Sequence, residues 1–221
     1  MSGPHALPKT RTQIVDRLLK AGAVAVLRLP EPDRLLPTVE AIVEGGVTAI
    51  EVTMTVPGAL EQIARMADAL GDTVVLGVGS VLDADTARAA ITAGASYVVS
   101  PVFKPSIIAA AHTYEAAAMP GCFTPTEIQA AHEAGADIIK VFPANVVGTA
   151  FFKGVLAPMP HLRLMPTGGV TLDNAGDWLR AGACAVGVGS ALLDKTAIAE
   201  GRYEVLTQNA RRLQASLATG R

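Results

Sequence analysis

Apolar runs recur along the chain, each directly after a glycine that ends a helical pattern. The glycines that carry this repeat are Gly22, Gly46, Gly94, Gly135 and Gly182. The first two are 24 residues apart, and each later interval is about twice as long. A glycine that closes a helix and leads straight into an apolar run predicts a helix followed by a buried parallel strand. The repeat therefore predicts a series of strand–helix units.

Each doubled interval contains a further apolar run, at residues 73–77, 116–119 and 162–165. Five repeat strands and these three make eight, and helical patterns separate them, for example at 60–70, 83–93, 126–134 and 172–180. Strict alternation of strand and helix predicts an α/β fold, here a single (β/α)8 TIM barrel. An open doubly wound sheet is the alternative.

Length and composition agree with one barrel. A chain of 221 residues suits a single domain of this kind. Half the residues are hydrophobic but only 4% are aromatic, so the core must consist of Val, Ile, Leu and Ala. We predict a flexible N-terminal tail at residues 1–12 and the barrel domain at residues 13–221.

Charge and cysteine content exclude several classes of function. A net charge of −2 argues against binding to nucleic acid or to an anionic membrane, and no apolar run is long enough to span a bilayer. The N-terminus lacks the apolar core of a secretory signal. Cys122 and Cys184 are far apart and belong to no metal or redox motif, which predicts free thiols in a reducing cytoplasm.

Catalytic residues of such barrels lie at the carboxyl ends of the strands. Glu51 and Lys140 are charges inside apolar runs there, and each lies five residues after its repeat glycine. The equal offset predicts similar height and an inward direction for both side chains. They could form a structural ion pair, although desolvation makes such pairs weak stabilisers. The functional interpretation is a lysine with a lowered pKa, ready to form a Schiff base, beside a proton-transferring carboxyl.

Two glycine-containing segments follow the last two predicted strands. They are Thr167-Gly168-Gly169 and the segment from Gly187 to Ser190. Glycine lets backbone N–H groups approach an anion closely, and barrels commonly bind phosphate after these two strands. A phosphate site is therefore predicted, with tight turns as the structural alternative.

Other chemically capable residues are weaker candidates. The four histidines have no metal-ligand spacing, so no metal site is expected. Lys104 and Lys153 follow predicted strands but lie outside apolar runs, and Cys122 has no base that can be assigned to it. Glu127, Asp173 and Asp177 are interpreted as charges at helix starts.

Several segments, in this order, resemble one enzyme family. These segments are Ile50-Glu51-Val52-Thr53, Gly77-Val78-Gly79-Ser80, Val99-Ser100-Pro101, Met119-Pro120-Gly121, Ile139-Lys140-Val141-Phe142-Pro143-Ala144 and Met165-Pro166-Thr167-Gly168-Gly169. They are similar to the bacterial 2-keto-3-deoxy-6-phosphogluconate aldolase / 4-hydroxy-2-oxoglutarate aldolase family, and the likeness runs from about Val24 to Leu193.

The resemblance implies a class I aldolase that needs no metal or other cofactor and forms a homotrimer. It makes Lys140 the Schiff-base lysine and Glu51 the general acid/base. It implies that Gly168, Gly169 and Ser190 hold the substrate phosphate, with Thr167 near the reacting carbons. Pro101 and Ser80 complete the expected substrate contacts, Ser80 replacing a threonine of many members.

One departure from the family pattern concerns the substrate carboxylate. Many members have an arginine four residues after the catalytic glutamate, where this chain has Thr55. Arg28 is the expected replacement, because a guanidinium binds a carboxylate with two hydrogen bonds. Its offset from Gly22 is six residues, so an outward direction is the structural alternative.

The expected reaction is cleavage of 2-keto-3-deoxy-6-phosphogluconate to pyruvate and glyceraldehyde 3-phosphate. The nearest alternatives are the 6-phosphogalactonate epimer and 4-hydroxy-2-oxoglutarate as substrates. More remote ones are a phosphosugar isomerase or epimerase of the same fold, a metal-dependent pyruvate aldolase and a non-catalytic binding protein.

Overall fold

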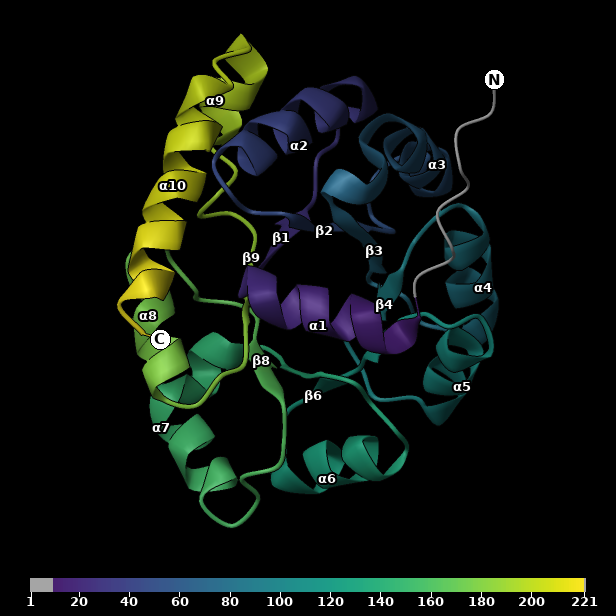
Figure 1. The fold of residues 1–221 in the computed structure, drawn as a ribbon, viewed down its shortest axis with the longest axis vertical. Helices are drawn as coiled ribbons and strands as arrows, with labels where there is room; N and C mark the ends of the chain where they lie inside the picture. The colour runs from purple at the N-terminus through teal and green to yellow at the C-terminus, as the bar shows by residue number, and fades with distance from the viewer. Residues whose placement is uncertain (1–9, 221) are drawn as a thin grey trace.

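The structure is a computed structural model that describes residues 10–220. Its strands are β1 (Ala23–Leu27), β2 (Ala49–Thr53), β3 (Val75–Gly79), β4 (Tyr97–Val99), β5 (Ala117–Met119), β6 (Gly121–Cys122), β7 (Ile139–Val141), β8 (Leu164–Pro166) and β9 (Val186–Val188). Its α-helices are α1 (Arg11–Ala21), α2 (Leu35–Glu44), α3 (Ala59–Leu70), α4 (Ala84–Thr92), α5 (Pro105–Thr113), α6 (Pro125–Glu133), α7 (Ala144–Leu156), α8 (Ala175–Arg180), α9 (Lys195–Glu200) and α10 (Glu204–Ala218). Figure 1 shows helices arranged around the strands, with α1 lying across them.

The strands form two parallel sheets, in the orders β5-β4-β3-β2-β1-β9 and β6-β7-β8. Only Pro120 separates β5 from β6, and its carbonyl accepts a hydrogen bond from the backbone N–H of Lys140 at 2.9 Å. On the other side, an isolated parallel bridge joins Thr167 to Gly187, and the N–H of Cys184 donates to Leu164 O at 2.9 Å. The fold is therefore α/β, with a curled parallel sheet whose two parts are hydrogen-bonded to each other.

The repeat glycines adopt the conformation that their role requires. All five have positive φ, between 70° and 116°. A left-handed residue ends a helix with little strain only when it is glycine. This local chemistry explains why an apolar strand can follow each helix so closely.

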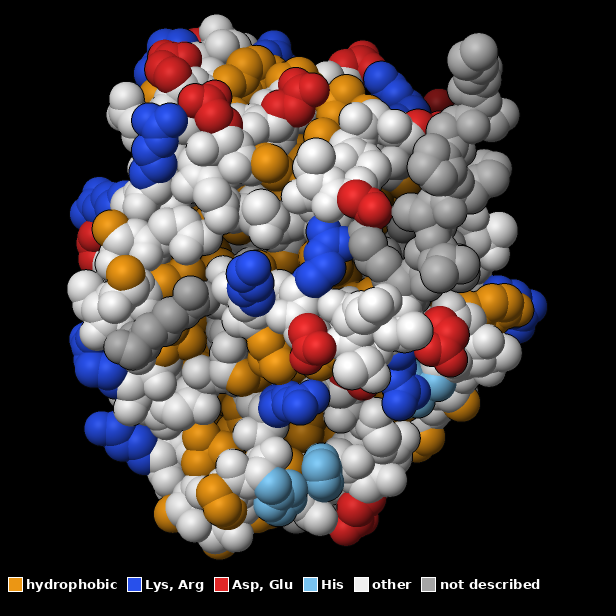
Figure 2. Space-filling model, in the orientation of Figure 1, with side chains coloured by type: hydrophobic (Ala, Val, Ile, Leu, Met, Phe, Trp, Pro, Cys, Tyr) orange, Lys and Arg blue, Asp and Glu red, His pale blue; other side chains and the backbone are white. Residues whose placement is uncertain are grey.

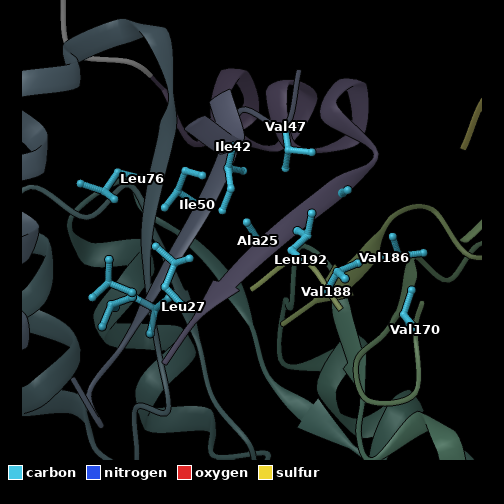
Figure 3. Packing of buried hydrophobic residues seen from close by; sticks show 14 of the residues in the cluster. Ala25, Leu27, Ile42, Val47, Ile50, Leu76, Val170, Val186, Val188 and Leu192 are labelled. Carbon is cyan, nitrogen blue, oxygen red and sulfur yellow. The ribbon is translucent and has the colours of Figure 1, made fainter. Parts of the chain in front are cut away.

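Alternation along the strands separates two apolar clusters. On β1, Val24 and Val26 face the interior of the curled sheet, while Ala23, Ala25 and Leu27 pack under the helices. Figure 3 shows part of the outer cluster, between the sheet and the helices. Burial of one such aliphatic side chain contributes about 1.5–3 kcal/mol.

The inner cluster is closed at one end by α1, through Ile14, Val15 and Leu18. This helix begins at Arg11, so it includes the last residues of the predicted tail. Thr10 and Gln13 explain the earlier start, because each side chain accepts a hydrogen bond from the other's backbone N–H. The rest of the predicted tail, residues 1–9, lies outside the described residues.

The last predicted helix starts later than its apolar pattern suggested, at Ala175 rather than near Leu172. Thr171 and Asn174 form a reciprocal pair of side-chain to backbone hydrogen bonds, which holds this segment as a turn.

None of the helices in residues 10–220 has both the length and the apolar character that a membrane span requires.

Candidate active site

Glu51 and Lys140 both face the interior of the curled sheet. On β2, Ile50 and Val52 pack outward under the helices, so Glu51 between them points inward. On β7, Ile139 and Val141 pack outward in the same way, so Lys140 also points inward. Glu51 is 1% exposed and Lys140 3% exposed. Both side chains are therefore buried in the interior of the curled sheet, where each charge influences the pKa of the other.

The Glu51 carboxyl lies against the backbone of β3. A Cβ atom placed on Gly79 would overlap Glu51 Oε1, so only glycine leaves room for the carboxyl here. Both carboxyl oxygens are buried and neither has a hydrogen-bond partner among the described residues. Burial raises the pKa of Glu51, and the charges of Lys140 and Arg28 partly oppose that rise. Such a carboxyl keeps its proton to a higher pH than an exposed glutamate does, which suits a group that must both give and take a proton.

The Lys140 amine is shifted in the opposite direction. Burial lowers its pKa, the Glu51 charge opposes the change, and the Arg28 charge adds to it. Its Nζ atom lies 5.0 Å from the centroid of the Phe142 ring. A lysine with a lowered pKa has a larger neutral fraction, and only the neutral amine is a nucleophile.

Arg28 directs its guanidinium toward this pair. It follows the end of β1, where the hydroxyl of Thr53 donates to Leu27 O at 2.9 Å and is itself 2.7 Å from the hydroxyl of Thr55. Arg28 Nη2 donates to Ser80 Oγ at 3.4 Å, a long hydrogen bond. Its charge acts on both Glu51 and Lys140. The inward direction is thus observed, although the side chain stays exposed to solvent at the mouth.

A pocket of about 400 Å³ opens at this end of the strands. Two basic side chains, Arg28 and Lys195, line it. Its lining contains no acidic side chain. The other polar or glycine positions that were predicted and that line it are Thr167, Gly168, Gly169 and Ser190. A pocket with two cations and several glycine backbones is suited to an anionic ligand.

The glycine-rich wall of this pocket is held by close packing. Gly168 and Gly169 have φ values of 97° and 75°. A Cβ atom on Gly169 would lie 2.6 Å from the Cβ of Asn145. One on Gly187 would overlap Thr167 Oγ1, which is buried and has no hydrogen-bond partner among the described residues. The absence of side chains at Gly169 and Gly187 therefore lets Asn145 and Thr167 pack directly against the backbone of the wall.

The family model described as KDPG and KHG aldolase matches residues 14–209, most of the chain. The chain belongs to this aldolase family. It is 34% identical over 174 residues to the 2-dehydro-3-deoxy-6-phosphogalactonate aldolase of Escherichia coli (strain K12), covering 78% of this chain and 85% of that protein. It is 33% identical over 198 residues to the 2-dehydro-3-deoxy-phosphogluconate aldolase of Treponema pallidum (strain Nichols), covering 88% and 92%. A solved structure described as "Native KDPGal structure" has a TM-score of 0.84 and 31% identity, covering 90% of this chain and 95% of that one.

Four of the predicted residues are absent from the pocket lining, namely Glu51, Lys140, Ser80 and Pro101. Glu51 and Lys140 are buried inside the curled sheet. Ser80 reaches the pocket only through Arg28. Pro101 packs behind β6, where a Cβ atom on Gly121 would lie 2.5 Å from Pro101 O. It supports the strand next to Lys140, and its contact with substrate stays a prediction.

Sequence reasoning missed Lys195, which lines the pocket, and Asn145, which packs against the glycines of the pocket wall. Lys195 is the first residue of α9, and Asn145 lies in the first turn of α7. Neither stands in an apolar run or in a glycine segment, so no pattern along the chain distinguished them.

The weaker candidates play other roles. Lys104 donates to Leu82 O, and Glu127 forms a reciprocal cap with Thr124 at the start of α6. Burial raises the pKa of the Cys122 thiol to about 12, which keeps it protonated.

The described histidines, His112, His132 and His161, do not line this pocket. Figure 2 shows histidine side chains gathered over α6, and the ring centroids of His132 and His161 are 4.8 Å apart. Within residues 10–220, no three His, Cys, Asp or Glu side chains are placed to hold a metal ion.

Proposed function

We propose that this chain is a class I aldolase that cleaves 2-keto-3-deoxy-6-phosphogluconate to pyruvate and glyceraldehyde 3-phosphate through a Schiff base on Lys140. The observation that carries the proposal is the buried pair of Lys140 and Glu51, with pKa values shifted in opposite directions, in a fold whose strand ends carry a pocket lined by two basic side chains. Family membership and relatives with this activity support it.

The proposed chemistry uses each group of the pair. Neutral Lys140 attacks the C2 ketone of the substrate, and protonated Glu51 assists the departure of water as the iminium forms. The carboxylate of Glu51 then takes the proton of the C4 hydroxyl, directly or through a water. The C3–C4 bond breaks, and its electrons move into the iminium to form an enamine.

The products then leave in order. The aldehyde, glyceraldehyde 3-phosphate, departs first. The enamine takes a proton at C3, and water hydrolyses the resulting iminium to pyruvate and free Lys140. The same bonds that form at C2 therefore break again, and the reaction is balanced without any redox step.

Binding groups are proposed at the two ends of the substrate. Arg28 binds the carboxylate, with Ser80 fixing the guanidinium. The backbone of Gly168 and Gly169, with the hydroxyl of Ser190, binds the phosphate, and Thr167 lies between.

The 6-phosphogalactonate epimer is a second candidate substrate. A relative that is 34% identical is named for that compound, as a 2-dehydro-3-deoxy-6-phosphogalactonate aldolase. The two sugar acids differ at one carbon, so the same amine, carboxyl and phosphate contacts serve either one.

We also propose that the two hydrogen-bonded sheets close into one eight-stranded (β/α)8 barrel. The hydrogen bonds at Pro120 and the bridge from Thr167 to Gly187 support that closure.

We propose the cytoplasm as the location of this protein. Its two free cysteines fit that reducing compartment.

A homotrimer is proposed as the assembly. Exposed apolar side chains follow several neighbouring strands, namely Leu82, Val102, Phe123 and Val146. Exposed apolar surface of this kind is typical of contacts between copies of a chain. Light scattering during size-exclusion chromatography should give three times the mass of 22.7 kDa, and a mass of one chain would contradict the proposal.

The proposed reaction is tested by coupling pyruvate release to lactate dehydrogenase and following NADH consumption. The three substrates to compare are the 6-phosphogluconate and 6-phosphogalactonate derivatives and unphosphorylated 4-hydroxy-2-oxoglutarate. We expect kcat/KM to be highest for a phosphorylated substrate. A failure to release pyruvate from all three, together with no borohydride-trapped adduct of pyruvate, would reject the aldolase assignment.

A further inference from the structure

Tyr97 lies in the same cross-strand row as Glu51. Backbone pairing places Glu51 opposite Gly77 on β3, and Gly77 opposite Tyr97 on β4. Tyr97 belongs to the apolar cluster inside the curled sheet and is fully buried. Residues that are paired across neighbouring parallel strands point to the same face of the sheet. The side chains of Glu51 and Tyr97 therefore both point into the interior of the curled sheet. They are separated only by the width of β3.

The glycine between them allows the tyrosine ring to cover β3. A Cβ atom on Gly77 would overlap Cε1, Cε2 and Cζ of Tyr97 to the same degree. These three atoms form the hydroxyl end of the ring. The ring therefore extends over Gly77 with its hydroxyl end toward β2. Gly79, the next inward residue of β3, makes room for the Glu51 carboxyl in the same way.

The polar atoms of this row lack direct partners. The Tyr97 hydroxyl and both carboxyl oxygens of Glu51 are buried, without a hydrogen bond to any described residue. Burial raises the pKa of Tyr97 well above its ordinary value, and the Glu51 charge raises it further. The phenol therefore keeps its proton and is a donor, while a carboxylate is an acceptor.

We propose that Tyr97 is a positioning residue for Glu51, whose carboxyl it holds by a hydrogen bond through one shared water molecule. Buried polar groups of complementary type are normally satisfied in this way. The inference rests on the proposed role of Glu51 in proton transfer.

The test is Tyr97→Phe, which removes the hydroxyl and keeps the ring. We expect kcat to fall about 2- to 10-fold, the range of one hydrogen bond, with KM unchanged. Borohydride trapping of pyruvate on Lys140 should proceed as in the parent protein, because the amine is untouched. If no adduct can be trapped on the parent protein itself, the result contradicts the proposed function and not the role of Tyr97.

The pH profile supplies a readout that packing alone would not change. The charged or titratable groups that act on Glu51 are Lys140 from β7, Arg28 after β1 and Tyr97 from β4. A hydrogen bond donated to a carboxylate favours its charged form, so loss of the hydroxyl raises the pKa of Glu51. The acidic limb of the kcat profile should therefore move to higher pH in Tyr97→Phe.

Two controls complete the test. Tyr114→Phe removes the same atom from a side chain that is 47% exposed, and it should leave kcat and the pH limb unchanged. In a Glu51→Gln background, Tyr97→Phe should lower kcat less than it does in the parent protein, because coupled residues are not additive.

Two results would overturn the inference. They are an unchanged kcat and acidic limb in Tyr97→Phe, or an equal fold loss of kcat in the two backgrounds. Circular dichroism at the assay temperature should show that each variant is folded, so that kcat is compared between folded proteins.

Discussion

The two ends of the proposed site differ in how deeply their charged side chains are buried. At the inner end, Glu51 and Lys140 are almost completely buried, and desolvation is the largest influence on the pKa of each. At the outer end, Ser190 and Lys195 are exposed, and Gly168, Gly169, Gly187 and Gly189 form part of the wall. Removal from water changes what a group can do chemically, whereas exposed contacts in water are individually weak. The inner end is therefore suited to bond making and breaking, and the outer end to recognition.

The inner end should be the more sensitive to substitution, and Lys140 most of all. Lys140→Ala removes the nucleophile, so aldol cleavage should fall to the detection limit. Lys140→Arg should be equally inactive, because a guanidinium stays protonated although it preserves the charge. Circular dichroism should show that the fold persists in at least one of the two variants.

Trapping with pyruvate and borohydride locates the amine. Intact mass and peptide mapping should place the adduct on Lys140 in the parent protein and show none in Lys140→Arg. Lys104→Ala and Lys153→Ala are matched controls that should retain the adduct. An adduct mapped to either of these lysines would overturn the assignment.

Glu51→Gln should have the next largest effect. The variant retains the amine, so the Schiff base should still form, but turnover should fall about 10²- to 10⁴-fold because proton transfer is lost. Single-turnover kinetics with mass detection of the adduct separates the two steps. Turnover close to that of the parent protein would show that Glu51 has a structural role only.

The pH profile sharpens the same point. Burial raises the pKa of Glu51 above its ordinary value of 4.5. The carboxylate must be deprotonated to act as a base, so kcat should decline as pH falls, at a pH above that value. Glu51→Gln should lack this acidic limb, and a limb that persists unchanged would assign it to another group.

Arg28 lies between the two ends, and its substitution should have an intermediate effect. Loss of a charge-assisted, two-pronged contact with the substrate carboxylate should lower kcat/KM about 10- to 100-fold in Arg28→Ala. Arg28→Lys should already be impaired, because the paired geometry is lost. The loss should be similar for phosphorylated and unphosphorylated substrates. A loss confined to the phosphorylated substrate would place Arg28 in the phosphate site instead.

The outer end should show the smallest effects. Ser190→Ala and Lys195→Met should raise KM a few-fold for the phosphorylated substrate alone, because each removes one solvent-exposed contact to the phosphate. Lys195→Arg is the conservative control, and it should retain the parent KM. The Lys195 effect should shrink at high salt, since exposed charges are screened. An equal rise in KM for unphosphorylated 4-hydroxy-2-oxoglutarate would remove both residues from phosphate recognition.

Residue order alone was sufficient for the parts of this protein that depend on local rules. The glycine repeat predicted where helices end and buried strands begin, because a left-handed helix cap nearly requires glycine. The five-residue offset placed Glu51 and Lys140 on one interior face, because side-chain direction alternates along a strand. The charge of each residue inside an apolar run then identified it as a candidate for catalysis.

Tertiary structure decided the parts that depend on neighbours far apart in the chain. The direction of Arg28 depended on how the chain leaves β1, and Lys195 reached the pocket from a helix that no pattern marked. Tyr97 looked like one more apolar strand residue until pairing of β2, β3 and β4 placed it across Gly77 from Glu51. Sequence periodicity reports the face of a strand on which a side chain lies. It does not report which side chain from another strand fills the space above a glycine, because that depends on register and packing in three dimensions.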